Sequence, residues 1–252
     1  MALLKKIKIL IFYGYILIFT LLISHNKLFA KNVDFEIIAG INPPLFIKFD
    51  GIKSQGIGVE ILIAALLKNN IKFKISETDL PWTRAVNLAT QKNSLTFLLR
   101  SIGREKSFKW ISSLYDENSI IVNLKKNPQI TSFTQINSLK KIGALAGSSA
   151  DIILKRLELN DKYYPCKSDM QCLELLSQEK IDAWISTTKK LIYNVKKKNY
   201  NNIMNKYFIL EKCQIWVATS LQTQEEDLQE LKIALDKYKQ TSQYKVILRK
   251  YD

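Results

Sequence analysis

Residues 98–110 read Leu-Leu-Arg-Ser-Ile-Gly-Arg-Glu-Lys-Ser-Phe-Lys-Trp, and the interpretation of the whole chain begins there. A mostly apolar run, Leu95–Leu99, ends in two arginines that lie four residues apart. β-formers followed by a charged turn predict a strand that delivers its carboxyl end to a crevice. An arginine held there, Arg100 or Arg104, offers a planar fork of donors that matches a carboxylate or a phosphate. The alternative is a solvated basic turn in a lysine-rich chain.

The net charge first raises the question of nucleic-acid binding, because the 252 residues carry a formal charge of +15. The excess is mostly lysine spread over the whole length, and its densest run is Lys196-Lys197-Lys198. No RNP, zinc-finger or helix-turn-helix pattern accompanies this charge. We therefore expect no nucleic-acid partner.

Residues 1–30 have the pattern of a secretory signal peptide. Lysines at positions 5, 6 and 8 precede an apolar run, Ile9–Ile23, and Leu28-Phe29-Ala30 offers a cleavage site. The alternative is an uncleaved membrane anchor, but the apolar run is shorter than the roughly 20 residues that a transmembrane helix prefers. We expect an exported, soluble mature chain. Its net charge is +11, because the leader holds four lysines and no acid.

The only histidine, His25, lies in this leader, so the mature chain has none. That excludes Ser-His-Asp and Cys-His catalysis and every metal site that contains a histidine. Three cysteines are too few for a four-cysteine zinc site, and we expect no metal and no cofactor. In an oxidising compartment two of them can pair, as Cys166–Cys172 or as Cys172–Cys213, which leaves one thiol over.

Strands and helices alternate along the rest of the chain, which predicts an α/β fold with two parallel-rich lobes. Residues 31–124 and 217–252 form the first lobe and residues 125–216 the second, with crossings near Leu124 and Val217. The expected strands are Phe35–Ala39, Ile71–Ile75, Leu95–Leu99, Ile120–Leu124, Lys141–Ala146, Ile181–Ile185 and Gln214–Thr219. Helices are expected over residues 58–68, 147–159, 169–179 and 187–197, after a short helix that opens at Pro81 and before one last helix after Thr223.

The turn Gly147-Ser148-Ser149 lies between a strand and a helix of the second lobe. Such a turn aims backbone N–H groups at one point and makes an anion site, although a plain helix cap is the alternative. Facing Arg104 of the first lobe, it would hold one carboxylate across a cleft.

Trp82 and Arg84 lie at a turn that we expect to open on the same crevice. Trp82 either stacks on a flat or aliphatic ligand or anchors its helix by packing. Arg84 either pairs with a ligand or with Glu77 or Asp79.

Motifs in a fixed order run through essentially all of the mature chain. They are Pro43-Pro44-Leu45-Phe46, Asp50-Gly51, Gly56–Ile61, Pro81–Ala85, Arg100–Trp110, Leu139–Gly143 with Gly147-Ser148-Ser149, Ile181–Trp184 and Ile247–Tyr251. Each is degenerate, but their order and spacing resemble the family 3 extracellular solute-binding proteins, the periplasmic polar-amino-acid receptors of ABC transporters. The resemblance implies a two-lobed periplasmic-binding-protein fold of type 2, with a two-strand hinge and closure around a ligand.

The resemblance further implies that Arg104 takes the ligand carboxylate and that the turn at Ser148 and Ser149 supplies opposing N–H groups. Family members that bind amino acids usually have an acidic residue where this chain has Thr187, and a stacking aromatic where it has Asn42. An ammonium buried without a carboxylate is costly, which argues against a standard α-amino acid unless another carboxylate compensates. The predicted ligand-binding residues are Arg104, Ser148, Ser149, Trp82, Arg100, Arg84 and Thr187, and none is predicted to be catalytic.

The leading hypothesis is a monomeric periplasmic receptor, and not an enzyme. It would capture a small carboxylate-bearing solute, amino-acid-like or an organic acid, and deliver it to an inner-membrane ABC permease. One alternative is a sensory receptor that feeds a signalling partner. Another is a periplasmic dehydratase on the same fold, which would need a general acid in the cleft. Glu60, Glu105 and Asp151 are available for that role, but none has a compelling setting.

Overall fold

The structure is a computed structural model that describes residues 35–75 and 80–252. The predicted signal peptide lies outside these residues, and so do Glu77 and Asp79, the predicted alternative partners of Arg84. None of the helices within the described ranges combines the length and apolar character needed to cross a bilayer.

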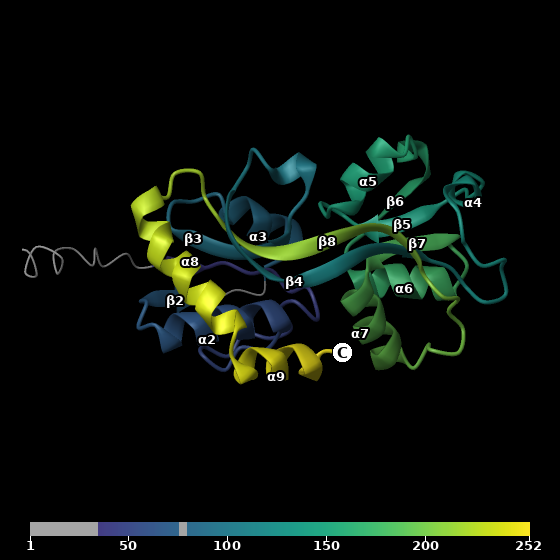
Figure 1. Ribbon diagram of the computed structural model, residues 1–252. Coiled ribbons are helices and arrows are strands. Elements are labelled where there is room, and N and C mark those ends of the chain that lie inside the picture. Colours follow the sequence, from purple (N-terminus) through teal and green to yellow (C-terminus); the bar gives the residue numbers. More distant parts are fainter. Residues whose placement is uncertain (1–34, 76–79) are drawn as a thin grey trace, which may run out of the picture. The chain divides into compact units, whose positions relative to one another are not determined.

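One mixed sheet organises the described residues (Figure 1), and its strand order is β2-β1-β3-β8-β4-β7-β5-β6. The strands are β1 Phe35–Ile37, β2 Phe73–Ile75, β3 Ser94–Leu99, β4 Lys109–Val122, β5 Ile142–Leu145, β6 Tyr163–Cys166, β7 Ala183–Thr187 and β8 Phe208–Thr219. β1 pairs in parallel with β2 and β3 at one end of the sheet, and β5 pairs in parallel with β6 and β7 at the other. Parallel strands joined through helices confirm the predicted α/β class.

The two long strands β4 and β8 join these two groups, which we call the first lobe (β1–β3) and the second lobe (β5–β7). β3 pairs with the carboxyl-terminal part of β8, from Leu95↔Thr219 to Leu99↔Ile215, and β7 pairs with the last residues of β4. Between them, residues 116–118 of β4 pair with residues 212–214 of β8, and no third strand is recorded there among the described residues. This two-stranded segment lies a few residues before the crossings predicted near Leu124 and Val217, and the lobe limits remain a prediction.

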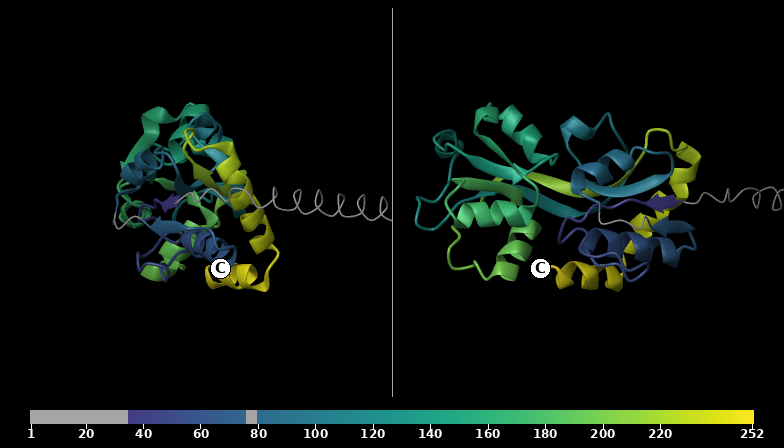
Figure 2. Two further views of the ribbon diagram at one scale, coloured as in Figure 1. Left: turned by 90° about the vertical axis from the view of Figure 1, so that its left-hand side faces the viewer. Right: turned by 180° about the vertical axis from the view of Figure 1, so that it is seen from behind.

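Helices cover both groups of strands, as the two views of Figure 2 show. They are α2 Ile57–Lys68, α3 Trp82–Leu88, α4 Phe133–Asn137, α5 Ala150–Arg156, α6 Asp169–Ser177, α7 Thr188–Lys198, α8 Glu225–Lys239 and α9 Ser242–Lys250, with short 3₁₀ turns η1 Ile102–Arg104 and η2 Asn160–Lys162. α2, α8 and α9 pack on one another beside the first lobe, and α6 and α7 pack on each other in the second. The helix predicted after Thr223 is confirmed as α8, but it is not the last one, because α8 ends at Lys239 and α9 starts anew with Thr241 as its cap.

The strand predicted over Ile120–Leu124 is the end of a longer one, because β4 already begins at Lys109. Trp110, the last residue of the stretch 98–110, therefore lies at the start of the strand that links the lobes. Polar residues at Ser112, Ser113 and Asp116 interrupt the apolar pattern of β4, and they concealed its length in the sequence.

The cysteines pair as Cys166–Cys172, the shorter of the two predicted options, and Cys213 is free. The disulfide joins the end of β6 to α6 beside the buried Trp184. Cys213 lies on β8, where burial raises the pKa of its thiol to about 12. A thiol with so high a pKa carries little thiolate near neutral pH and reacts slowly.

We expect thiol titration to show this arrangement directly. The folded protein should react on the order of 100-fold more slowly than the denatured protein, since only the thiolate is nucleophilic. The denatured protein should release one equivalent and the reduced, denatured protein three. Cys213→Ser should abolish the single equivalent, and labelling of Cys166 by peptide mapping would contradict the pairing.

Candidate functional site

A small cavity of ≈ 40 Å³ lies where the two lobes meet the linking strands. The first lobe contributes Asn42, Pro44, Leu45, Trp82, Leu99 and Arg104, the second contributes Ser148, Ser149, Thr187, Lys189 and Lys190, and the linking strands contribute Tyr115, Glu117 and Ile215. Five of the seven predicted ligand-binding residues therefore line one cavity, although they come from opposite halves of the sheet. We call this the inner cavity.

Arg104 reaches from one lobe to the other. It ends η1, directly after the wholly buried strand β3, and only 9% of its surface is exposed. Its Nη1 donates to the carbonyl of Leu99 at 3.3 Å, and its Nη2 donates to the carbonyl of Gly147 at 2.9 Å. The guanidinium is therefore fixed in orientation by backbone carbonyls on both sides of the cavity.

The turn before α5 is built partly as a helix cap. The N–H of Ser148 donates to Leu145 O at 3.1 Å, and the hydroxyl of Ser148 accepts from the N–H of Ala150 at 3.2 Å. Ser149, which is 91% buried, forms the N-cap position of α5. Both residues line the inner cavity, so the capping interpretation and the predicted ligand-binding role describe the same turn.

Trp82 packs as predicted for a helix anchor, and it also lies in the inner cavity, where stacking on a ligand stays a prediction. It packs in an apolar cluster with Leu98, Phe108 and Leu145, and it lines the inner cavity at the same time. Its buried Nε1 has no hydrogen-bond partner among the described residues. The ammonium of Lys190 lies 5.9 Å from its ring centroid, which places the indole beside a positive charge.

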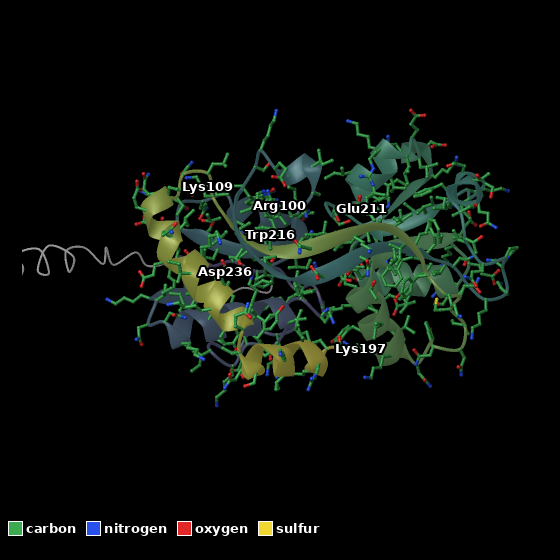
Figure 3. The ribbon with its side chains drawn as sticks, in the orientation of Figure 1. Arg100, Lys109, Lys197, Glu211, Trp216 and Asp236 are labelled. Carbon is green, nitrogen blue, oxygen red and sulfur yellow. A yellow bond between two sulfur atoms is a disulfide. The ribbon has the colours of Figure 1, made fainter. Side chains whose placement is uncertain are left out.

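Arg100 and Arg84 do not join the inner cavity. Arg100 forms a bidentate ion pair with Glu105, at 2.7 and 3.0 Å, and lies over the ring of Trp216 at 4.5 Å (Figure 3). It therefore braces a wall beside the inner cavity. Arg84 is exposed on α3 and lines neither the inner cavity nor the groove beside it.

That groove is much larger, at ≈ 1130 Å³, and we call it the outer groove. It runs along β8 between η1 and α5, and it shares Glu117 and Ser149 with the inner cavity. Arg100 and Trp216 line one part of it, and Glu211 with its partner Arg156 of α5 lines another (Figure 3). The inner cavity and the outer groove adjoin at Glu117 and Ser149, and we call the two together the cleft.

Nine lining residues were not predicted as ligand contacts, and five of them are polar, namely Asn42, Tyr115, Glu117, Lys189 and Lys190. Glu117 is the most informative, because a glutamate side chain that is 95% buried in the middle of a strand needs an explanation. Its Oε1 accepts from the N–H of Asn118 at 2.9 Å, and its Oε2 accepts from the N–H of Lys189 at 3.3 Å. No local signal in the sequence could have identified it, because it lies in the polar stretch Asp116-Glu117-Asn118-Ser119.

Burial shifts the acid–base equilibrium of this group. Loss of solvation raises the pKa of Glu117, and the hydrogen bonds from the amides and Thr187, with the charge of Lys189, only partly oppose that rise. Burial, followed by the charge of Glu117, also raises the pKa of Tyr115. Tyr115 therefore stays neutral, and burial makes the ionised form of Glu117 costly in solvation.

We expect Glu117→Gln to leave the free energy of unfolding unchanged or higher at neutral pH. A carboxyl whose folded pKa is raised binds more protons in the folded state, so it lowers stability as pH rises through that pKa. The advantage of the variant should grow as pH rises from about 4, near the pKa of an unperturbed glutamate, toward neutrality. Urea unfolding across this range measures it, and a constant difference would contradict the electrostatic account.

The two lysines of the inner cavity have acidic partners. The ammonium of Lys190 lies 2.8 Å from Asp169, whose other oxygen accepts from the hydroxyl of Ser186 at 3.2 Å. The ammonium of Lys189 pairs with the side chain of Asp252. Counting Arg104, three basic groups and one acid line the inner cavity among the described residues, which favours a ligand with at least one negative charge.

The carboxyl groups considered from the sequence as general acids lie elsewhere. Glu60 bonds Lys250 and the hydroxyl of Tyr251 between α2 and α9, and Glu105 is held by Arg100. The side chain of Asp151 falls outside the described residues. Glu117 is the carboxyl that the described part of the inner cavity contains.

No family model and no curated protein sequence matches this chain. Solved structures do match its fold. A histidine kinase sensor domain with similarity to periplasmic binding proteins aligns over 88% of this chain and 96% of its own, with a TM-score of 0.76 and 13% identity. The substrate-binding protein of an amino acid ABC transporter aligns over 86% and 98%, with a TM-score of 0.67 and 18% identity.

A third similar structure is the ancestral amino-acid-binding protein AncCDT-1, a precursor of cyclohexadienyl dehydratase. It aligns over 86% of this chain and 95% of its own, with a TM-score of 0.71 and 14% identity. At these identities the alignments establish the fold and nothing further. The predicted two-lobed periplasmic-binding-protein fold is confirmed.

Proposed function

We propose that this chain, which has the two-lobed fold of the periplasmic binding proteins, is an exported receptor for a small carboxylate-bearing solute. The observation that carries the proposal is the position of Arg104, a buried arginine that bridges both lobes inside the inner cavity. A guanidinium in that position suits a carboxylate, and the excess of basic over acidic lining groups supports the same sign of charge. Binding would involve no bond chemistry.

In this proposal Arg104, Trp82, Ser148, Ser149 and Thr187 contact the ligand. Arg100 and Arg84 were predicted to contact the ligand. We instead assign Arg100 to the wall of the outer groove and Arg84 to the exposed surface of α3. An inner-membrane ABC permease is the proposed recipient, which the similarity to the substrate-binding protein of an amino acid ABC transporter supports. Cleavage near residue 30, a periplasmic location and a monomeric mature chain complete the proposal.

A thermal-shift screen tests the proposal. Probes are the L-amino acids, their α-hydroxy and desamino analogues, and small dicarboxylic acids. A solute at about 100 times its Kd should stabilise the protein by about 2.7 kcal/mol, since it binds only the folded state. Polyamines, which carry no carboxylate, serve as the negative class. Stabilisation by polyamines alone, or by no carboxylate, would contradict the proposal.

A second candidate is a dehydratase, and Glu117 is the observation that favours it. A buried carboxyl with a raised pKa at the cavity is the kind of general acid that such an enzyme needs, and AncCDT-1 is a dehydratase precursor. Turnover of prephenate or arogenate by the purified protein, lost in Glu117→Gln, would establish this candidate. Stoichiometric binding without turnover excludes it.

A sensory role is the third candidate, and the aligned histidine kinase sensor domain favours it. The inner cavity would serve a sensor and a transport receptor alike, so the discriminating measurement concerns the partner. Stimulation of the ATPase activity of a reconstituted permease by the loaded receptor supports transport. Stimulation of a membrane kinase supports sensing.

A further inference from the structure

We propose that Glu117 and Asn42 form a subsite for the ammonium group of the ligand, so that the receptor takes α-amino-acid-type zwitterions. This rests on the proposed function, and it reverses the expectation drawn from Thr187, where the resemblance places an acid. The resemblance expects the acidic residue at the position of Thr187, just before α7, whereas in this chain Glu117 lies on the strand β4 beside it. There it lines the inner cavity together with Arg104.

Glu117 is placed to receive a cation. It is 95% buried, and no lysine or arginine nitrogen of the described residues forms an ion pair with it. Its protein partners are the N–H groups of Asn118 and Lys189 and the hydroxyl of Thr187. The charge of Lys189 acts on this carboxyl, but the hydrogen bonds that the carboxyl accepts all come from neutral donors, so it gains from a ligand that donates with a full positive charge.

Asn42 of the first lobe provides an independent observation in the same cavity. It is 97% buried in the loop after β1, and its backbone is fixed by hydrogen bonds with Leu45 and Phe46. Its side-chain Oδ1 has no hydrogen-bond partner among the described residues. An orphaned buried acceptor is costly, and a donor supplied by the ligand would satisfy it. An ammonium carries three N–H donors, so a carboxylate and an amide oxygen suit it.

The lysines of the inner cavity do not serve as the positively charged hydrogen-bond partner of Glu117. The ammonium of Lys190 is engaged by Asp169 at 2.8 Å, and that of Lys189 by Asp252. The charged groups that face Glu117 are therefore two lysines with partners of their own and Arg104, which is held by carbonyls of Leu99 and Gly147.

The competing interpretation is that Glu117 only caps α7. The bond from the N–H of Lys189 to Oε2 fits a cap, since that amide lies in the first turn of the helix. A cap does not account for the orphaned Oδ1 of Asn42 in the same cavity. It also predicts no effect of Glu117 on the choice between ligands.

Calorimetric titration with matched probes tests the inference, using each L-amino acid that binds and its desamino analogue, which keeps the carboxylate and lacks the amine. We expect wild type to bind the amino acid at least about 10-fold more tightly, and Glu117→Gln to reduce that preference to about threefold or less. Affinity for the desamino analogue should stay within about threefold. Asp116→Asn is the matched control, because this exposed neighbour on β4 loses the same charge and is bonded to Gln214.

The outcomes separate this inference from the proposed function. Equal wild-type affinity for both probes, or an amino preference that survives in Glu117→Gln, overturns the ammonium subsite and leaves the carboxylate receptor standing. Binding of no carboxylate overturns both. If Glu117→Gln does not fold, Asn42→Ala replaces it, and it should reduce the amino preference while desamino binding is kept.

Discussion

Replacement of Arg104 with alanine is expected to weaken ligand binding by about 100-fold or more. The side chain is 91% buried in the inner cavity and bridges the carbonyls of Leu99 and Gly147. The substitution removes both the partner of the ligand carboxylate and a contact between the lobes. Truncating one member of a buried charged pair costs about 2–5 kcal/mol, which includes the loss expected here. Calorimetry with a ligand from the thermal-shift screen measures it.

Arg100→Ala is the matched control for Arg104→Ala. Arg100 lies four residues earlier in the same motif, but it pairs with Glu105 and stacks on Trp216 outside the inner cavity. About one third of its side chain is exposed, and ion pairs of this kind contribute about 1 kcal/mol or less. Affinity should therefore stay within about fivefold of wild type. Equal losses in the two variants would contradict the assignment of Arg104.

Gly103→Val is expected to weaken ligand binding by about 10-fold or more without lowering the melting temperature of the free protein. A Cβ at Gly103 would clash with Cδ1 of Ile152 in the second lobe, so a side chain there requires Ile152 or its lobe to shift. Overpacking of a close contact costs about 1–3 kcal/mol. We expect opening of the cleft to relieve that strain, so the strain should fall on the closed, ligand-bound state. Calorimetry and thermal unfolding measure the two effects.

A second substitution provides the control for Gly103→Val. Ile152 belongs to α5 of the second lobe, and Ile152→Ala removes the atoms that the new side chain would meet. The double variant should regain most of the lost affinity. If affinity is not regained, or if Gly103→Val alone lowers the melting temperature by several degrees, the valine acts on the fold of its own lobe and not on closure.

The elements that local pattern could predict are those whose side chains face a core. All six residues of β3 are buried, and Arg104 follows them at the position expected from the opening motif. The alternation of strands and helices likewise predicted the two parallel groups of strands. In these places one local signal, an apolar run followed by a charged turn, agrees with the tertiary structure.

The parts that escaped prediction belong to the cleft. The linking strand β4 presents polar residues to the cleft and to solvent, so the first part of it did not resemble a strand. Glu117 is followed by Asn118, a pair typical of an exposed turn. Its burial depends on the first turn of α7, where Lys189 lies 72 residues further along the chain. A contact between residues so far apart in the sequence cannot be predicted from a local pattern of residues.

Every role proposed for the cavity residues depends on the ligand being held by its charged groups inside the inner cavity. A crystal structure of the receptor with a ligand from the screen tests it most directly. We predict the ligand carboxylate within hydrogen-bond distance of Arg104 and its amino group within hydrogen-bond distance of Glu117. A ligand seated only in the outer groove along β8, or one whose carboxylate lies away from Arg104, would contradict the account.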